Sequence, residues 1–166
     1  MTVSFIKKTN GWRCCYKKDD KKFTVYYGIN SYGKYAKSLA EMSEKTGKRY
    51  NNYIIENGDV AIIKIAHRGI IYDIMIDIED IKKVENYKLR IVTYTCNNKT
   101  YLYTRAVDRR VDGKYKYKQL TRIITNNDNC ELIYFKNKDR FDYRKENLII
   151  YAPCRISEKR VDVLNE

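Results

Sequence analysis

Few residues of the types that usually carry catalysis occur in this chain of 166 residues. The only histidine is His67, so a mechanism that needs a histidine base has a single candidate. The five cysteines are odd in number and none has the C-x2-C spacing of a zinc site, so we interpret them as small buried thiols in a reducing compartment. The densest group of polar side chains lies in residues 134–148, which include the carboxylates of Asp139 and Asp142.

The spacing within this polar segment is found in a known family. The segment reads Tyr-Phe-Lys-Asn-Lys-Asp-Arg-Phe-Asp-Tyr-Arg-Lys-Glu-Asn-Leu. Residues 52–151 resemble the phage-borne HNH homing endonucleases, whose motif runs D-H-x-N-x-D-x-x-D-N-R-x-x-N-L. The motif residues that recur in register, without a gap, are Asn137, Asp139, Asp142, Arg144, Asn147 and Leu148. The family's L-H-R-x-I motif is similar to residues 120–124, its opening hairpin to residues 53–60 and its I-D-x-E-D helix to residues 76–84.

The residues that differ from the family are those that perform its chemistry. In an HNH site a histidine deprotonates water, and a neighbouring aspartate and a later helix asparagine hold a divalent metal that stabilises the leaving 3′-oxygen. The resemblance places Phe135 at the base position, Tyr134 at the acidic ligand position and Ile156 at the asparagine position. Thr121 stands where the family has the histidine of L-H-R-x-I. Phenylalanine and isoleucine neither bind a hard cation nor accept a proton.

The resemblance therefore implies a preserved framework without its chemistry. The framework residues are Asn137, Asp139, Asp142 and Asn147, which would shape the turn. We expect no catalytic residue, no bound metal and no cofactor, and His67 is a weak candidate for a replacement base because it lies far from the motif in sequence.

Residues 11–49 resemble the Apetala-type DNA-binding domain, in which strands place their exposed face in the major groove and a helix packs behind them. The matching features are Gly11-Trp12-Arg13, the aromatic strand at residues 23–27 and the run from Ser31 to Ala40. If the hairpin docks as in that family, the candidate contacts are Trp12, Arg13, Lys17, Lys21 and Lys22. Tryptophan can pack on sugars and arginine can fork onto a guanine edge. The alternative for Trp12 is a position in the core. The alternative for the whole segment is a generic hairpin with a helix, unrelated to this domain.

A second group of candidate contacts follows in the later half of the chain. Basic residues interleave with tyrosines there, and the basic ones are Arg105, Arg109, Arg110, Lys114, Lys116, Lys118 and Arg122. Alternation in residues 114–118 predicts a strand with lysines on one face for phosphates and tyrosine rings on the other face for the core. Four further cations surround the polar turn: Lys136, Lys138, Arg140 and Arg144. For Arg144, the alternative to a contact with nucleic acid is a structural role.

The charge of the whole chain favours a polyanionic partner. The formal net charge is +13, from 34 basic and 21 acidic side chains. Residues 1–60 and residues 101–150 carry most of the excess, which suggests two contact surfaces on a long ligand. No segment approaches the roughly 18 apolar residues of a membrane span, and the first ten residues lack the apolar run of a signal peptide. We expect no membrane partner.

Local patterns predict an α+β fold of small antiparallel hairpins with short helices. We expect an N-terminal module over residues 1–50, in which strands at 12–16 and 22–27 precede a helix at 32–45, capped by Asn30-Ser31 and ended by Gly47. The HNH-like module, of ββα-metal type, would fill residues 51–166. Its predicted strands are 53–55, 60–65, 70–76, 88–95, 100–106, 132–135 and 148–151, with a helix at 77–87 and a helical tail from Pro153.

The leading functional expectation is a non-catalytic nucleic-acid-binding protein of phage or mobile-element origin. It would act in the cytoplasm of a bacterial host by occupying duplex DNA, with RNA as the other ligand. A second hypothesis is an interaction protein, for instance a phage-encoded inhibitor that binds a CRISPR effector nuclease or its guide or target nucleic acid. A third is an active HNH nuclease with a rearranged site.

Overall fold

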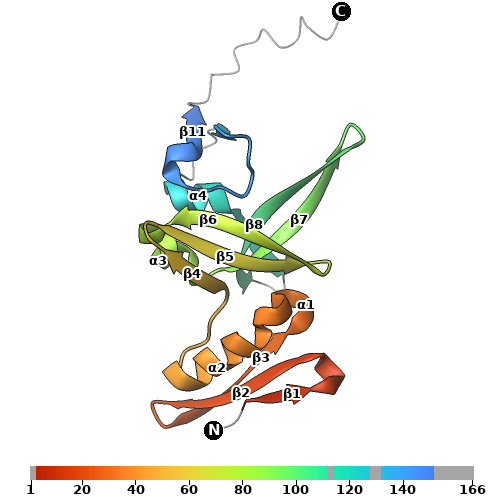
Figure 1. Cartoon of the computed structure of the whole chain (residues 1–166), viewed down its shortest axis with the longest axis vertical. Coiled ribbons are helices and arrows are strands. Elements are labelled where there is room, and N and C mark those ends of the chain that lie inside the picture. The colour runs from red at the N-terminus through yellow and green to blue at the C-terminus, as the bar shows by residue number, and fades with distance from the viewer. Residues whose placement is uncertain (1–2, 112–113, 128–131, 152–166) are drawn as a thin grey trace, which may run out of the picture.

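A computed structural model describes residues 3–111, 114–127 and 132–151 (Figure 1). Over these residues the chain is α+β, as predicted, and its sheets are small and antiparallel. Three sheets have three strands each, in the orders β1-β2-β3, β4-β5-β6 and β7-β8-β9, and the fourth is the β10-β11 hairpin. Within the described residues, no helix combines the length and the apolar character needed to cross a membrane.

The first sheet and its helices form the lower part of Figure 1. The elements are β1 (Ser4–Ile6), η1 (Lys7–Thr9), β2 (Gly11–Lys18), β3 (Lys21–Gly28), α1 (Ile29–Tyr32), η2 (Gly33–Tyr35) and α2 (Ala36–Thr46). Asp19 and Asp20 both have positive φ angles, of 47° and 58°, as a two-residue type I′ turn requires. This turn fixes the register of β2 against β3, so that Trp12 pairs with Tyr27. Strand β1 was not predicted.

The helix predicted over residues 32–45 is divided into three pieces. Gly33 interrupts it with a φ of 56°, a conformation that side chains other than glycine rarely adopt. A Cβ at this position would lie 2.7 Å from Cδ1 of Ile71 in β6, so packing against another sheet also disfavours a larger side chain here. The Asn30-Ser31 cap is wrong, because the chain enters α1 directly from β3 with Gly28 as its N-cap.

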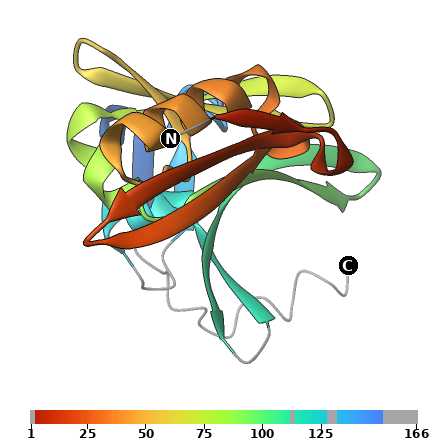
Figure 2. The same ribbon diagram turned by 90° about the horizontal axis from the view of Figure 1, so that it is seen from below.

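Helix α2 itself follows its sequence pattern. The predicted stripe of Ala36, Leu39, Ala40 and Ser43 is buried, and Gly47 ends the helix with a left-handed φ of 64°. These residues pack on the inner face of β2 and β3, where the buried Tyr27 hydroxyl lies 2.6 Å from the Ser43 hydroxyl. The first hydrophobic cluster of the molecule is therefore a sheet covered by one helix (Figure 2).

The remaining elements share a second, larger hydrophobic cluster. They are β4 (Tyr53–Asn57), β5 (Val60–His67), β6 (Ile70–Asp77), η3 (Ile78–Asp80), α3 (Ile81–Val84), β7 (Lys88–Cys96), β8 (Lys99–Val111), β9 (Lys114–Gln119), α4 (Leu120–Thr125), β10 (Leu132–Phe135), η4 (Lys145–Asn147) and β11 (Leu148–Tyr151). The helix predicted at 77–87 is shorter than expected. The fully buried core of this cluster includes Ile63, Ile74, Ile76, Leu120 and Ile124. The tail from residue 152, including Ile156 and Pro153, lies outside the described residues.

Candidate nucleic-acid interface

The polar segment forms a hydrogen-bonded loop between β10 and β11. The Asn137 side chain receives the Asp139 amide at 2.8 Å and donates to Oδ2 of Asp142 at 2.9 Å. Oδ1 of Asp139 accepts the Phe141 amide at 2.9 Å. Asn147 closes the loop, because its oxygen accepts the Asn137 amide at 2.8 Å and its amide donates to the Asp142 carbonyl at 2.7 Å. The framework residues named from the sequence thus share one network.

Asp142 is the centre of this network and is fully buried. Arg144 donates to both of its carboxylate oxygens, from Nε at 2.8 Å and from Nη2 at 2.7 Å, which is a bidentate ion pair. The Arg144 guanidinium holds the pKa of the Asp142 carboxyl below its ordinary value, and the Asn137 hydrogen bond acts in the same direction. The loop is also joined to β6, because backbone bonds connect Met75 to Phe141 at 2.9 Å and to Tyr143 at 2.8 Å.

Arg144 is therefore occupied as a structural residue. Its remaining nitrogen, Nη1, lies 2.6 Å from the exposed carboxylate of Glu146, so both sides of its guanidinium face acidic partners. The structural alternative for Arg144 fits this geometry, and its contact with nucleic acid stays a prediction. Lys136, Lys138 and Arg140 on the same loop are exposed.

The positions that carry chemistry in the HNH family hold aromatic packing here. Tyr134 is exposed and lies edge-on to Tyr151, with 5.3 Å between ring centroids. Phe135 packs edge-on against the buried Tyr143 at 5.2 Å. Phe135 and Thr121, two positions that the resemblance assigns to family histidines, line the same pocket of about 370 Å³. Phe135 contributes an aromatic ring to the lining of this pocket, and Thr121 contributes a hydroxyl group.

His67 lies at the end of β5, in a different pocket from Phe135 and Thr121. Its neighbours there include Arg68, Lys88 and Arg90, which are all cations. A cationic neighbourhood is unsuited to a divalent ion, so His67 does not stand in for the missing base.

One group of carboxylates does come together in the described part of the chain. Asp77, Glu79 and Asp80 have ligand atoms within 4.8 Å of one another at the start of η3. Lysines already neutralise this group. Lys83 Nζ lies 2.8 Å from Oδ1 of the buried Asp80, and Lys145 Nζ pairs with Glu79 and lies 3.5 Å from Asp80. We interpret the cluster as an ion-pair network that joins η3 to η4.

The β7-β8-β9 sheet has one buried face and one open face. Leu89, Ile91 and Ala106 point into the second hydrophobic cluster. Side chains alternate along a strand, so the residues between them point the other way. The cross-strand pairs on that side are Tyr94 with Tyr101, Val92 with Tyr103 and Arg90 with Arg105, followed by Lys88 with the buried Val107 at the end that α1 covers. Tyr117 of β9 lies on the same side, since it also pairs with Val107.

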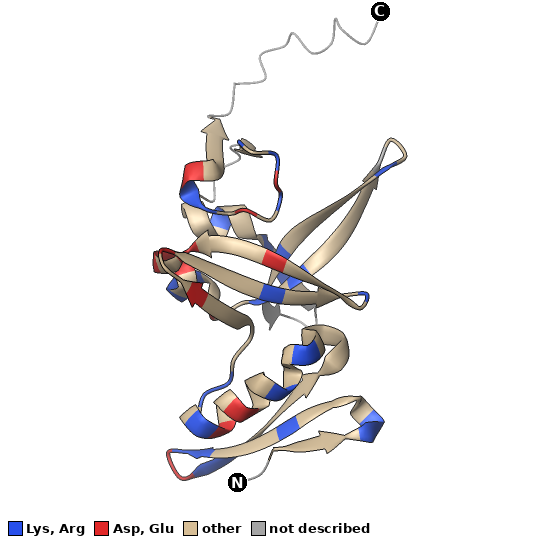
Figure 3. Cartoon of the chain, in the orientation of Figure 1, with Lys and Arg blue, Asp and Glu red and all other residues tan. Residues whose placement is uncertain are grey.

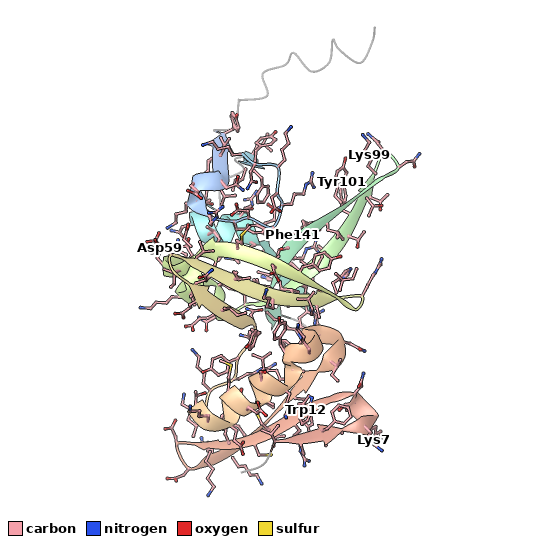
Figure 4. All side chains as sticks on the ribbon, in the orientation of Figure 1. Lys7, Trp12, Asp59, Lys99, Tyr101 and Phe141 are labelled. Atoms are coloured by element: carbon pink, nitrogen blue, oxygen red, sulfur yellow. The ribbon has the colours of Figure 1, made fainter. Side chains whose placement is uncertain are left out.

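We call this open side the Arg–Tyr face, and define it by Arg90, Tyr94, Tyr101, Tyr103, Arg105 and Tyr117. The Arg105 guanidinium carbon lies 5.0 Å from the ring centroid of Tyr117 and 5.5 Å from that of Tyr103. Nη2 of Arg105 also donates to the Tyr103 hydroxyl at 2.6 Å. Arg140 reaches from the polar loop and stacks on Tyr101 at 4.4 Å (Figure 4). Stacking of this kind holds a guanidinium plane in a fixed orientation.

Positive charge is concentrated on this face. Arg90 and Arg105 stand directly opposite each other on neighbouring strands, and like charges in that relation destabilise a sheet. Residues 86–107 contain neither aspartate nor glutamate, and Asp108, near the end of β8, is the first acidic residue after them. In Figure 3 the red ribbon segments of acidic residues gather near α3. This run without acidic residues is the sequence feature that points to Arg90, Tyr94 and Tyr101, which were not among the contacts predicted from the sequence.

The predicted role of the tyrosines on β9 is wrong. Tyr115 and Tyr117 are 52% and 47% exposed, so these rings do not pack into the core. The reason is the register of β9, which pairs Tyr117 with Val107 and places its ring beside Arg105, on the side of the sheet opposite the core residue Ala106. Lys116 and Lys118 are exposed as predicted.

The N-terminal sheet separates its predicted contacts onto two faces. Trp12 lies on the face that packs against α2, where Lys37 Nζ is 5.4 Å from its ring centroid, so the core alternative holds for Trp12 (Figure 4). Lys21 pairs with Lys18 on that same side. Arg13 faces the opposite, open side, together with Lys17 and its cross-strand partner Lys22. Only these three of the five predicted contacts share a surface.

The other predicted contacts are placed less fully. Arg122 is half-buried in α4. The side chains of Arg109, Arg110 and Lys114 lie outside the described residues.

Comparisons with protein-family models, with curated proteins and with solved structures gave no match. A function for this protein therefore has to be inferred from the geometry of the two open sheet faces.

Proposed function

We propose that this protein binds nucleic acid through the Arg–Tyr face and does not cleave it. The observation that supports this most is the Arg90–Arg105 pair, which places two cations side by side on an open sheet without a described carboxylate on that face. Such a pair costs stability in the free protein and becomes favourable when a phosphate lies between its members. Tyrosine rings beside the arginines add surfaces on which sugars or bases can pack.

The ligand we propose first is duplex DNA. A second open face supports this choice, because Arg13, Lys17 and Lys22 lie on the same side of the N-terminal sheet. Both sheets could contact one extended ligand, as the two basic regions of the sequence suggested. The likeness to Apetala-type domains in residues 11–49 adds to the case for DNA, and a single-stranded DNA or an RNA is the competitor to test.

Binding of a labelled duplex of random sequence, measured by fluorescence anisotropy over a range of salt concentrations, tests the proposal. We expect micromolar or tighter binding at low salt and a steep, linear fall of log K with log salt. Single-stranded DNA and RNA of equal length are the competitors. Absence of binding to all three, with capture of the protein by a nuclease complex, would favour the interaction-protein hypothesis instead.

We expect no cleavage of DNA by this protein. Tyr134 and Phe135 stand where the family resemblance requires a carboxylate and a base, so no water would be activated there. Supercoiled plasmid incubated with excess protein and Mg²⁺ or Mn²⁺ should remain supercoiled over hours, as in buffer alone. Nicking that is abolished by Asp139→Ala would contradict this expectation and support the rearranged nuclease.

A further inference from the structure

A pocket of about 230 Å³ lies where α1 meets β5 and β7. Its basic lining consists of His67 and Arg68 at the β5-β6 turn and of Lys88 and Arg90 on β7. Helix α1 contributes the side chains of Asn30 and Ser31 from the other side. Four basic groups from the β5-β6 turn and from β7 thus line one space, and two polar residues line it from the N-terminal part of the molecule.

Lys88 is held in this pocket as a partly desolvated cation. Its ammonium lies 4.5 Å from the ring centroid of Tyr32 in α1. Burial lowers the pKa of Lys88 to about 8, and the positive charges of Arg90 and Arg49 contribute to the same shift. Within the described part of the chain, the charged groups that perturb Lys88 are thus all cations. A lysine kept in such surroundings lacks a counter-charge.

His67 gives an independent indication of a ligand. Its Nε2 is shielded from solvent and has no hydrogen-bond partner among the described residues. The ring is held edge-on to Tyr72, with 6.4 Å between centroids. A shielded ring nitrogen without a partner costs free energy, and an oxygen of a bound anion would satisfy it.

We propose that this pocket binds a phosphate group between Lys88, His67, Arg68 and Arg90. A phosphate oxygen would accept hydrogen bonds from the ammonium, the imidazole and the guanidinium groups, and would supply the missing negative charge. Arg90 also belongs to the Arg–Tyr face, so the pocket continues that surface toward α1. The phosphate group is either part of the backbone of a bound nucleic acid or a free phosphate ion. The proposal rests on the proposed function only in the first case.

Thermal melting in inorganic phosphate tests the pocket without any nucleic acid. Relative to chloride at equal ionic strength, phosphate should raise the melting temperature of the wild-type protein in a saturable way, because the anion binds only the folded pocket. Lys88→Met should melt at a higher temperature than wild type in chloride, since it removes an uncompensated cation but keeps an unbranched side chain against Tyr32. It should show no response to phosphate. Lys82→Met, at an exposed position on α3, is the matched control and should keep the wild-type response.

The pH dependence of Lys88 gives a second readout. In chloride, the side-chain NMR signal of Lys88 should titrate near pH 8, and saturating phosphate should raise this pKa because the anion favours the ammonium. In chloride, wild type should be less stable than Lys88→Met, and this difference should shrink as the pH rises from about 8 toward 10.5. Between these two pH values Lys88 has lost its proton in the folded protein but still carries it in the unfolded chain. Arg49, Arg90, Arg68, His67 and Tyr32 remain in both proteins, so their effects cancel in the difference.

The outcomes separate the two sources and the two proposals. If Lys88→Met loses the phosphate response and binds duplex DNA at least severalfold more weakly, the site takes a backbone phosphate. If it loses the response and binds duplex DNA as wild type does, the site takes a free phosphate. Equal melting shifts in wild type and Lys88→Met, or no shift in wild type, would overturn the pocket. A Lys88-dependent shift in a protein that binds no nucleic acid would instead count against the proposed function alone.

Discussion

Replacement of Asp142 by asparagine is expected to lower the free energy of unfolding by about 3 kcal/mol. The carboxylate is fully buried and receives two hydrogen bonds from the Arg144 guanidinium, one from the Arg144 backbone amide and one from Asn137. Asparagine has one acceptor oxygen in place of two, so the buried side of the guanidinium loses a partner and its charge is no longer balanced. Urea denaturation followed by circular dichroism measures the change.

Glu146→Gln is the matched control, because it changes the other acidic partner of the same arginine. Glu146 is exposed, so this change should cost less than about 1 kcal/mol. The stabilisation by Asp142 also has a defined pH dependence. Its folded pKa is lowered, so its contribution is complete above the ordinary aspartate pKa of 3.8 and is lost as the pH falls through the folded value. Equal costs for the two variants at neutral pH would show that Asp142 does not organise the loop.

Replacement of Arg105 by glutamate is expected to weaken duplex DNA binding on the order of tenfold to a hundredfold. The change removes the cation that Tyr103 and Tyr117 hold in place and introduces a charge that repels phosphate. It also creates an opposite-charge pair with Arg90 across the strands, so the variant should be at least as stable as wild type. A loss of affinity in the anisotropy assay with an unchanged or higher melting temperature could not be attributed to unfolding.

Lys82→Glu carries the same change of charge on α3 and should lower the affinity less than about threefold through the general loss of positive charge. Arg105→Lys separates the two roles of the arginine, because it keeps the charge and loses the stacked plane. We expect it to bind between wild type and Arg105→Glu. If Arg105→Glu and Lys82→Glu weaken binding equally, the ligand does not recognise the Arg–Tyr face.

The parts of the fold that follow a local period could be predicted from the sequence. The buried stripe of α2 repeats with the helical period, and the β10 and β11 strands bracket the polar turn as expected. The spacing of Asn137, Asp139, Asp142 and Asn147 also identified one connected network, since each acts on a backbone group a few residues away.

The errors arose where a distant segment decides the local structure. The helix breaks at Gly33, where φ is positive and the side chain of Ile71, far along the chain, occupies the space of a Cβ. The tyrosine rings of β9 are exposed because the pairing with β8 places Tyr117 on the same side of the sheet as Arg105, and periodicity does not reveal which side faces the core. The sequence left the role of Arg144 open between ligand contact and structure, because the burial of its partner Asp142 depends on backbone bonds to Met75 in β6.

The facing of Arg90 toward Arg105 and the position of Trp12 both depend on two-residue turns whose residue types are visible in the sequence. Asn97 and Asn98 adopt positive φ angles of 48° and 57°, as in a two-residue type I′ turn, and this register sets Arg90 opposite Arg105. The turn at Asp19 and Asp20 likewise puts Trp12 on the apolar face with Tyr27. Because side chains alternate along each strand, the position of these two turns is sufficient to assign the residues of both faces.

Photo-crosslinking of wild-type protein to a duplex that carries a photoreactive base, followed by peptide mapping, tests the central claim most directly. We predict adducts on strands β7, β8 and β9, concentrated at Tyr94, Tyr101, Tyr103 and Tyr117 and suppressed by high salt. Adducts confined to the β10-β11 hairpin or to α3, with the tyrosines of the Arg–Tyr face unmodified, would contradict it.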